Sequence, residues 1–237
     1  MKFAATLLIL VGTIGLACSS GRVEKYSLRP TGPEPETAKA RFSFSGELEK
    51  PVDDLPSKFS LSGRLHTSIV GKQADGAYTR RTRYKIEAAS PALEPDDEKE
   101  WVTESFYDRN GNKIKAAKST EGADLPWMPS LNFEPPAQDV AVGDAWTTVN
   151  PGTPDSDEPA SFGASQLAGI EMVSGTKCFR VEQVFRSGGA EPKLSYSTVW
   201  IRQSDGSVLK VDTAGSVRNF KDSNVNLKVA FSLTFEG

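Results

Sequence analysis

The sequence predicts a mainly β protein, an antiparallel meander of about nine to eleven strands that forms a strongly curved sheet, an open barrel or a sandwich. Apolar and polar residues alternate with a period of two through most of the chain. Glycine-containing turn signals separate the alternating segments, and no window shows a 3.6-residue apolar stripe with helix caps. A short helix over Ala116–Asp124 stays open as an exception.

An N-terminal leader precedes the strands. Residues 1–17 combine a positive Lys2, an apolar stretch from Phe3 to Ile14 and the small residue Ala17, which is the pattern of a secretory signal peptide. The apolar run is about fifteen residues long, and a membrane-spanning helix needs roughly twenty. We therefore predict that this leader is removed on export.

Cys18 follows the leader directly. The run Gly15-Leu16-Ala17-Cys18, with two serines after it, resembles the lipobox of bacterial lipoproteins, although Leu16 is displaced by one place from its usual position there. This resemblance implies that Cys18 is diacylated and becomes the mature N-terminus, and that Ser19 directs the protein to the outer membrane. Ordinary cleavage after small residues stays open as the alternative.

Residues 18–40 are predicted to form the lipidated N-terminus and a flexible tether. The stretch from Ser19 to Ala40 is rich in Ser, Pro and charged residues and has no hydrophobic period. Such a segment buries too little apolar surface to offset the entropy of ordering it. Residues 41–237 then form a single β-rich domain.

The first two predicted strands are almost alike, FSFSGEL at Phe42–Leu48 and FSLSGRL at Phe59–Leu65. In each, Phe and Leu share one parity while Ser and the charged residues share the other, so one face is expected to be buried and the other exposed to solvent. Gly46 and Gly63 fall in the buried rows, where glycine commonly marks a bend, a bulge or a close backbone approach. Two copies are too few for a solenoid, so we interpret the similarity as shared strand physics.

Later strands follow at regular intervals. The strongest hairpin signals are Asn110-Gly111, Ser174-Gly175 and Asp205-Gly206, each between two strand-like arms. The segment VNLKVAFSLTFEG closes the chain with the same alternation.

One predicted strand, within AYTRRTRYKIEA, is strongly basic. Its outward parity holds three cations and its inward parity holds a mixed set. The outward residues are Arg81, Arg83 and Lys85, and the inward residues are Arg80, Thr82, Tyr84 and Ile86. Two interpretations stay open: the cations meet phosphate head groups or an acidic partner, or they form a solvated face that discourages edge aggregation.

The region from Leu125 to Trp146 departs from the meander. Its four prolines forbid a helix or a central strand, yet its apolar side chains need cover. Either this loop plugs an open end of the sheet, or it gates a ligand, because long apolar loops in compact domains are often functional. The possible ligand gate consists of Trp127, Met128, Leu131 and Phe133.

Two segments carry a resemblance to known proteins. The run into VAVGDAW (Val140–Trp146) resembles a pattern in several uncharacterised bacterial secreted β proteins. The hairpin TVWIRQSDGSVLKVD is similar to the paired strands of the lipoprotein-carrier class, the LolA- and LppX-like half-barrels. That resemblance implies acyl chains held inside a curved sheet, but the helical lid of those carriers has no counterpart in this sequence.

The composition limits the partners and the chemistry. A net charge of −3, from 28 basic and 31 acidic residues, argues against a nucleic-acid partner. Cys178 is left without a disulfide partner if Cys18 is acylated, and we predict that it is a buried apolar residue. The only histidine, His66, has outward parity, so neither a Ser-His-Asp triad nor a zinc site is expected.

Carboxylates form three clusters, all in loops that contain proline, where solvated charge is the usual explanation. These clusters are Asp53-Asp54, Asp96-Asp97-Glu98 and Asp155/Asp157/Glu158. The run Asp108–Asn112 is similar to a calcium loop, but its glycine comes too early and a hairpin explains it. We predict no catalytic residue, no metal and no cofactor.

These observations predict a non-catalytic envelope lipoprotein, held in the outer membrane by its acyl anchor and facing the periplasm or the surface. Its β domain is predicted to bind an apolar or acyl ligand in the hollow of the curved sheet. The alternative is a structural or protein-interaction module of the cell envelope without a small ligand. A third hypothesis is an enzyme that cleaves glycans with two carboxylates.

Overall fold

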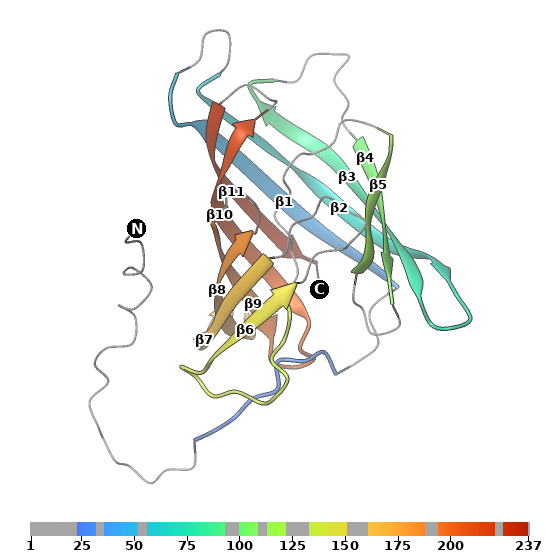
Figure 1. Ribbon diagram of the computed structural model, residues 1–237, viewed down its shortest axis with the longest axis vertical. Coiled ribbons are helices and arrows are strands. Elements are labelled where there is room, and N and C mark those ends of the chain that lie inside the picture. The colour runs from blue at the N-terminus through green and yellow to red at the C-terminus, as the bar shows by residue number, and fades with distance from the viewer. Residues whose placement is uncertain are drawn as a thin grey trace, which may run out of the picture.

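The computed structural model describes residues 23–31, 36–51, 56–92, 100–108, 113–121, 133–150, 161–187, 194–220 and 225–236. These ranges contain eleven strands and no helix (Figure 1). The strands are β1 (Thr37–Leu48), β2 (Lys58–Lys72), β3 (Tyr78–Ser90), β4 (Glu100–Tyr107), β5 (Lys113–Glu121), β6 (Ala145–Asn150), β7 (Ser161–Val173), β8 (Thr176–Ser187), β9 (Leu194–Arg202), β10 (Val208–Phe220) and β11 (Val225–Phe235).

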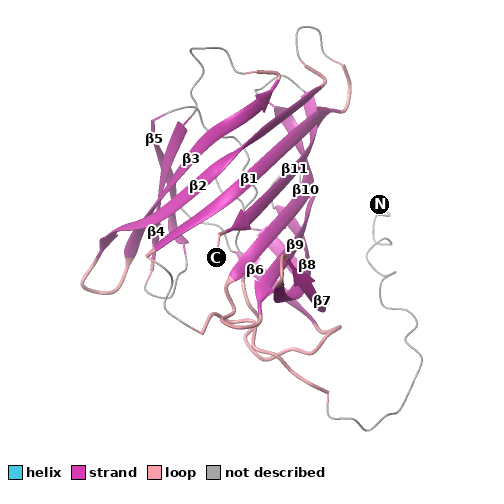
Figure 2. Cartoon of the chain, turned by 180° about the vertical axis from the view of Figure 1, so that it is seen from behind, coloured by secondary structure: helices cyan, strands magenta, loops and turns pink. Residues whose placement is uncertain are grey.

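All strands belong to one antiparallel sheet in the order β5-β4-β3-β2-β1-β11-β10-β9-β8-β7-β6. Strands β1 and β11 pair at its centre, so the two ends of the domain meet there, and every other pair joins strands consecutive in sequence. The sheet is not closed: β5 and β6 are its edges. It curls so that β3–β5 and β6–β9 lie on opposite sides of its inner face (Figures 1 and 2). The prediction of a curved sheet or open barrel with nine to eleven strands is confirmed.

The two-residue period accounts for the two faces of the sheet. In β1, Ala40, Phe42 and Phe44 are buried while the residues between them are exposed. The same alternation continues on the paired strands, where Leu65 of β2 and Leu233 of β11 are buried on the same side. The inner face of these three strands is therefore apolar, and its buried apolar residues belong to one core cluster.

Gly46 and Gly63 allow close approaches on this inner face. A Cβ at Gly63 would overlap the carbonyl oxygen of Lys85, at the point where a β-bulge shifts the register between β2 and β3. A Cβ at Gly46 would overlap the ring of Phe59, which lies over that glycine. Both glycines therefore have the role that the sequence predicted, a bulge or a close approach.

Two of the predicted hairpin turns lie within the described chain. Ser174 and Gly175 both have positive φ, 48° and 80°, as in the two-residue type I′ turn between β7 and β8. In the β9–β10 turn, the Asp205 carboxylate accepts hydrogen bonds from the backbone N–H and hydroxyl of Ser207, at 2.8 and 2.6 Å. These bonds lower the pKa of Asp205 below its ordinary value.

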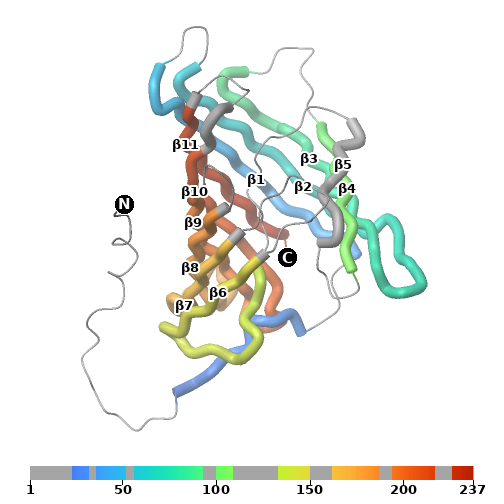
Figure 3. The backbone as a smooth tube through the Cα atoms, viewed as in Figure 1, coloured from blue at the N-terminus to red at the C-terminus, as the bar shows by residue number. Residues whose placement is uncertain are grey.

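Residues 23–31 form a segment that we call the strap. Tyr26 pairs with Val140 through two backbone hydrogen bonds of 2.8 and 3.0 Å, and Leu28 is only 1% exposed. Thr31 N–H donates to the Asp205 carbonyl at 2.9 Å. The strap crosses the end of the sheet beside the β9–β10 turn (Figure 3). The prediction of a flexible tether is therefore wrong for this segment, because Tyr26 and Leu28 supply the apolar contacts that the tether was expected to lack.

Two further predictions concern segments at the edges of the described chain. Residues 113–121 form β5, paired antiparallel with β4, so the possible helix over Ala116–Asp124 is wrong for its described part. The pairing of Tyr107 with Lys113 confirms the hairpin, although Asn110 and Gly111 lie outside the described residues.

The leader, Cys18 and residues 19–22 also lie outside the described chain. Within the part that is described, no helix has the length and apolar character needed to cross a membrane.

Candidate functional site

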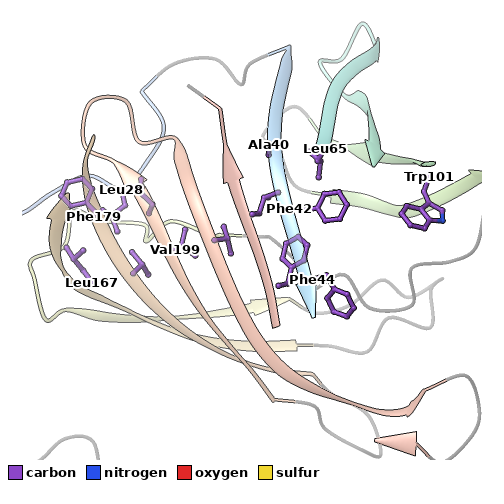
Figure 4. Close-up of a cluster of buried hydrophobic side chains, with 14 of the residues drawn as sticks. Leu28, Ala40, Phe42, Phe44, Leu65, Trp101, Leu167, Phe179 and Val199 are labelled. Atoms are coloured by element: carbon purple, nitrogen blue, oxygen red, sulfur yellow. The ribbon is translucent and has the colours of Figure 1, made fainter. Parts of the chain in front are cut away.

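The inner face of the sheet has two halves, and the strap packs on one of them. On the half formed by β7 to β10, Leu28 lies in the buried cluster with Leu167, Phe179 and Val199 (Figure 4). The same cluster continues to Phe42, Phe44 and Trp101 on the other half. The rings of Tyr26 and Phe179 lie 5.1 Å apart. This half is a core that the protein fills with its own side chains.

The other half carries a group of aromatic side chains that we call the aromatic wall. It consists of Phe42, Phe44, Phe59, Tyr84 and Trp101, from the four adjacent strands β1 to β4. Phe42 meets Tyr84 edge-on at 6.0 Å between centroids, and Phe44 lies 5.4 Å from Phe59. Phe42, Phe44 and Trp101 lie together on one side of the sheet, away from Leu28 (Figure 4).

Trp101 and Tyr84 are cross-strand neighbours on this wall. Trp101 is 8% exposed, and its indole Nε1 is buried without a hydrogen-bond acceptor. Burial, with a smaller contribution from Tyr107, raises the pKa of Tyr84 to about 12. The Tyr84 hydroxyl is therefore neutral at physiological pH, and the wall presents uncharged polar groups within an apolar surface.

A buried polar ladder crosses the inner face on β7 to β10. The residues pair across the strands, and two hydrogen bonds satisfy them: Gln183 Nε2 donates to Ser165 Oγ at 3.0 Å, and the hydroxyls of Ser197 and Thr213 lie 2.8 Å apart. The sequence pattern does not distinguish these residues, since a Ser or Thr in an apolar row is not distinctive. Because its members bond to one another, the ladder has a structural explanation.

Of the possible ligand gate, Phe133 lies in the described chain, and Trp127, Met128 and Leu131 lie outside it. Phe133 is partly buried against the core cluster and meets the Trp146 ring at 6.4 Å. Trp146 Nε1 donates to the Glu134 carbonyl at 3.2 Å. This end of the loop is thus packed on β6.

The connection that contains the gate links the two open edges of the sheet. Strand β5 ends at Glu121 on one edge, and β6 begins at Ala145 on the other. Residues 122–132, between these two strands, lie outside the described residues.

The outward cations of β3 are paired with acidic residues of the neighbouring strand. Arg81 bonds to Glu104 at 2.7 Å and Arg83 bonds to Glu100 at 3.1 Å, both across the β3–β4 pair. Lys85 is exposed on the same face. These contacts favour the solvated outer face over a phosphate-binding row, since exposed ion pairs neutralise the local charge.

A shallow depression of about 350 Å³ lies on the outer side of β1 to β3. It is lined by hydroxyl groups, chiefly of Ser43, Ser45, Ser60 and Ser62, together with small or apolar residues of the same strands. None of its lining residues is ionisable. It therefore offers no acid, base or metal ligand.

The outer side of β6 to β9 carries an apolar group that we call the outer patch. Its large side chains are 39–59% exposed; Val149 pairs with Phe162 and Val184 pairs with Tyr196, while the exposed Arg186 lies opposite both Phe162 and Leu194. The patch consists of Val149, Phe162, Val184, Leu194 and Tyr196. Soluble monomers rarely expose a contiguous apolar surface without an interaction role.

The other candidates for chemistry are separated in the structure. His66 is exposed on the outer face, as predicted. Cys178 is buried, so the prediction of a buried residue is confirmed; its thiol lies 3.5 Å from the Thr176 carbonyl, and burial raises its pKa. The described chain contains no group of three or more His, Cys, Asp or Glu residues that could hold a metal ion. The three acidic clusters lie outside the described residues.

Sequence reasoning missed Trp101. Its parity mates on β4 are Thr103, Ser105 and Tyr107, so this strand lacks the apolar row that marks the inner face of β1. One pattern could have indicated its direction: Trp101 begins an alternating segment that follows the basic strand in the sequence. That signal gives the direction of the side chain but identifies no acceptor for it.

No protein-family model and no curated protein matches the chain. Among solved structures, the chain is similar to DynF from the dynemicin biosynthesis pathway of Micromonospora chersina, with a TM-score of 0.26 and 8% identity. The match covers 92% of this chain and 86% of that one. A likeness this weak carries no argument about function, so the site is interpreted from its own geometry.

Proposed function

We propose that this chain is an exported, acyl-anchored envelope protein whose β domain binds an apolar or acyl ligand without catalysis. The aromatic wall on β1 to β4 is the observation that supports the proposal. Five aromatic side chains converge on the inner face of an open sheet, in the half away from Leu28. Ligand pockets are typically lined by such apolar and aromatic groups with a few polar ones among them.

The positions of the two sheet edges are consistent with a ligand that enters from the open side of the sheet. Because the connection between β5 and β6 runs from one edge to the other, the gate residues Trp127, Met128 and Leu131 belong to a segment that joins these edges. We propose that this segment covers the bound ligand. Phe133, packed on Trp146, then holds one end of the cover in place.

We propose a function without catalysis because of where the two candidate catalytic residues in the described chain lie. His66 points to solvent on the outer face, and Cys178 is a buried thiol with a raised pKa. Neither belongs to the aromatic wall. A nucleophile and its base need to be within hydrogen-bond reach of each other and of the substrate.

The anchoring part of the proposal rests on the lipobox-like leader and on the position of the strap. Four residues lie between Cys18 and Val23, and the five residue steps span at most about 18 Å. An acylated Cys18 would therefore hold the strap end of the domain close to the membrane, in an outer-membrane or other envelope location.

The ligand proposal is tested on protein purified from membranes. Native mass spectrometry should give a mass above that of the acylated polypeptide, and a fluorescent fatty acid should bind and be displaced. Leu65→Phe adds bulk beside Tyr84 and should weaken this binding at least several-fold, whereas Val70→Phe on the exposed part of β2 should leave it unchanged. A bare polypeptide mass together with no fatty-acid binding would refute the proposal.

The anchor is tested separately by labelling cells with radioactive palmitate. Cys18→Ser should abolish the label, and Cys178→Ser should retain it because Cys178 is buried in the sheet. Label that persists in Cys18→Ser would exclude this anchor and leave the ligand proposal untouched.

A second candidate function is a protein-interaction module of the cell envelope, and the outer patch favours it. A photo-crosslinking amino acid at Phe162 should then capture one envelope protein in cells, and the same group at Val70 should not. Equal capture from both positions would remove this candidate.

A further inference from the structure

The indole N–H of Trp101 is a buried donor without an acceptor. The side chain is 8% exposed, and Nε1 makes no hydrogen bond. Buried indole N–H groups in native proteins usually have a partner, because a donor removed from water without an acceptor destabilises the fold. An exception on a concave apolar surface therefore needs an explanation.

Unlike Trp101, the other two tryptophans in the described chain have hydrogen-bond acceptors for their indole N–H groups. Trp146 Nε1 donates to the Glu134 carbonyl at 3.2 Å, and Trp200 Nε1 donates to Glu171 Oε1. Both are less buried than Trp101. The two partly exposed indole N–H groups, which water could reach, thus have protein acceptors. The most buried of the three has none.

The surroundings of Trp101 identify the kind of group that is missing. Across the strands, its inner-face row continues through Tyr84 to Leu65 and Ala40, so hydrocarbon and aromatic surface predominates. The pKa of Tyr84 is raised by burial, which keeps its phenol neutral. A partner for Trp101 thus needs an acceptor atom attached to an apolar body.

We propose that Trp101 Nε1 donates a hydrogen bond to a carbonyl or carboxyl oxygen of the bound ligand, which is therefore an acyl compound and not a plain hydrocarbon. This inference rests on the proposed function and adds the ligand's polar group to it. The apolar chain of the ligand extends from Trp101 past Tyr84 and Leu65 towards β1. Three strand spacings cover roughly 15 Å, which is about the length of a medium-length acyl chain.

Competition experiments on the full chain test this assignment. The probe is a fluorescent dansyl fatty acid, displaced by three compounds of similar length: dodecane, methyl laurate and lauric acid. Methyl laurate should bind about tenfold more tightly than dodecane, the effect of one buried neutral hydrogen bond. Comparison of the ester with the acid shows whether the acceptor is a neutral carbonyl or a carboxylate.

Trp101→Phe removes the donor and keeps an aromatic ring, although a smaller one. In this variant the preference for methyl laurate over dodecane should fall below about twofold, while dodecane binding is retained. Trp200→Phe is the matched control, since its indole already donates to Glu171, and it should keep the tenfold preference.

A second measurement uses the wild-type protein, so it does not depend on whether a variant folds. In protein labelled with ¹⁵N-tryptophan, the indole resonance of Trp101 should shift downfield with methyl laurate and not with dodecane. Equal affinity for both compounds in the wild type, or a preference retained in Trp101→Phe, would overturn the inference while ligand binding stands. Failure of every compound to displace the probe would overturn the proposed function and this inference with it.

Discussion

Tyr84 lies on the inner row between Leu65 and Trp101, and burial raises the pKa of its hydroxyl to about 12. In the unfolded chain a tyrosine ionises near pH 10. The fold favours the neutral phenol, so the stabilisation is fully present below about pH 10 and is lost as the pH rises to about 12. A shift of two pKa units corresponds to about 2–3 kcal/mol of unfolding free energy.

This difference is measurable in Tyr84→Phe. Between about pH 9.5 and pH 11.5, the free energy of unfolding should fall by about 2 kcal/mol more in the wild type than in the variant. Ultraviolet absorbance of phenolate should show one late-titrating tyrosine that disappears in Tyr84→Phe. Identical pH profiles for the two proteins would contradict the burial of this hydroxyl.

For single residues, the odd–even parity of a strand predicted well whether a side chain points inward or outward. Phe42 is inside, His66 and Arg81 are outside, and Arg80 and Tyr84 share the inward parity of β3. Parity could not predict that Arg81 and Arg83 would be matched by glutamates of β4, because that depends on the register of the pair. It also could not predict the unbonded Trp101 N–H, because parity contains no information on distant acceptors.

Among the elements, the strap is held by contacts with residues far away in the sequence. Leu28 is 1% exposed, and Arg29 Nε donates to the Pro136 carbonyl at 3.3 Å, over a sequence separation of 107 residues. A Cβ at Gly206 would overlap the Arg29 carbonyl, so this turn needs glycine where the strap crosses it. A short segment rich in Ser, Pro and charge has no hydrophobic period, so these contacts could not be predicted from its pattern.

Leu28→Ala should therefore destabilise the domain. A fully buried leucine truncated to alanine costs about 2–5 kcal/mol, through lost apolar burial and a residual cavity. Val23→Ala in the same strap is the control, because Val23 is 68% exposed and should change stability by less than about 0.5 kcal/mol. Urea unfolding measures both. Equal midpoints for Leu28→Ala and the wild type would mean that the strap detaches in solution.

On the scale of the whole molecule, the strand count and the curvature were predictable, but the closure of the sheet was not. Alternation and turn signals are local, and each predicted hairpin joins neighbours in sequence. Whether such a meander closes into a barrel depends on whether its edges meet. Here β1 pairs with β11, so the first and last strands are central and the edges β5 and β6 come from the middle of the chain. No local pattern contains that long-range pairing.

The same arrangement gives the molecule two apolar surfaces, one inside and one outside. The aromatic wall is buried on the inner face, whereas Phe162 and Tyr196 of the outer patch are 54% and 56% exposed. Dyes such as anilinonaphthalene sulfonate bind contiguous apolar surface more strongly than scattered residues.

Phe162→Ser combined with Tyr196→Ser should therefore lower the dye fluorescence several-fold, because the two changes interrupt the outer patch. Val70→Ser is the control, since Val70 is exposed on β2 and is not part of this patch. Each exposed substitution should cost less than about 1 kcal/mol, so the fold and the aromatic wall persist in both proteins. Fluorescence that remains in the double variant would assign the dye to the inner face. It would then support the aromatic wall, rather than the outer patch, as the binding surface of this domain.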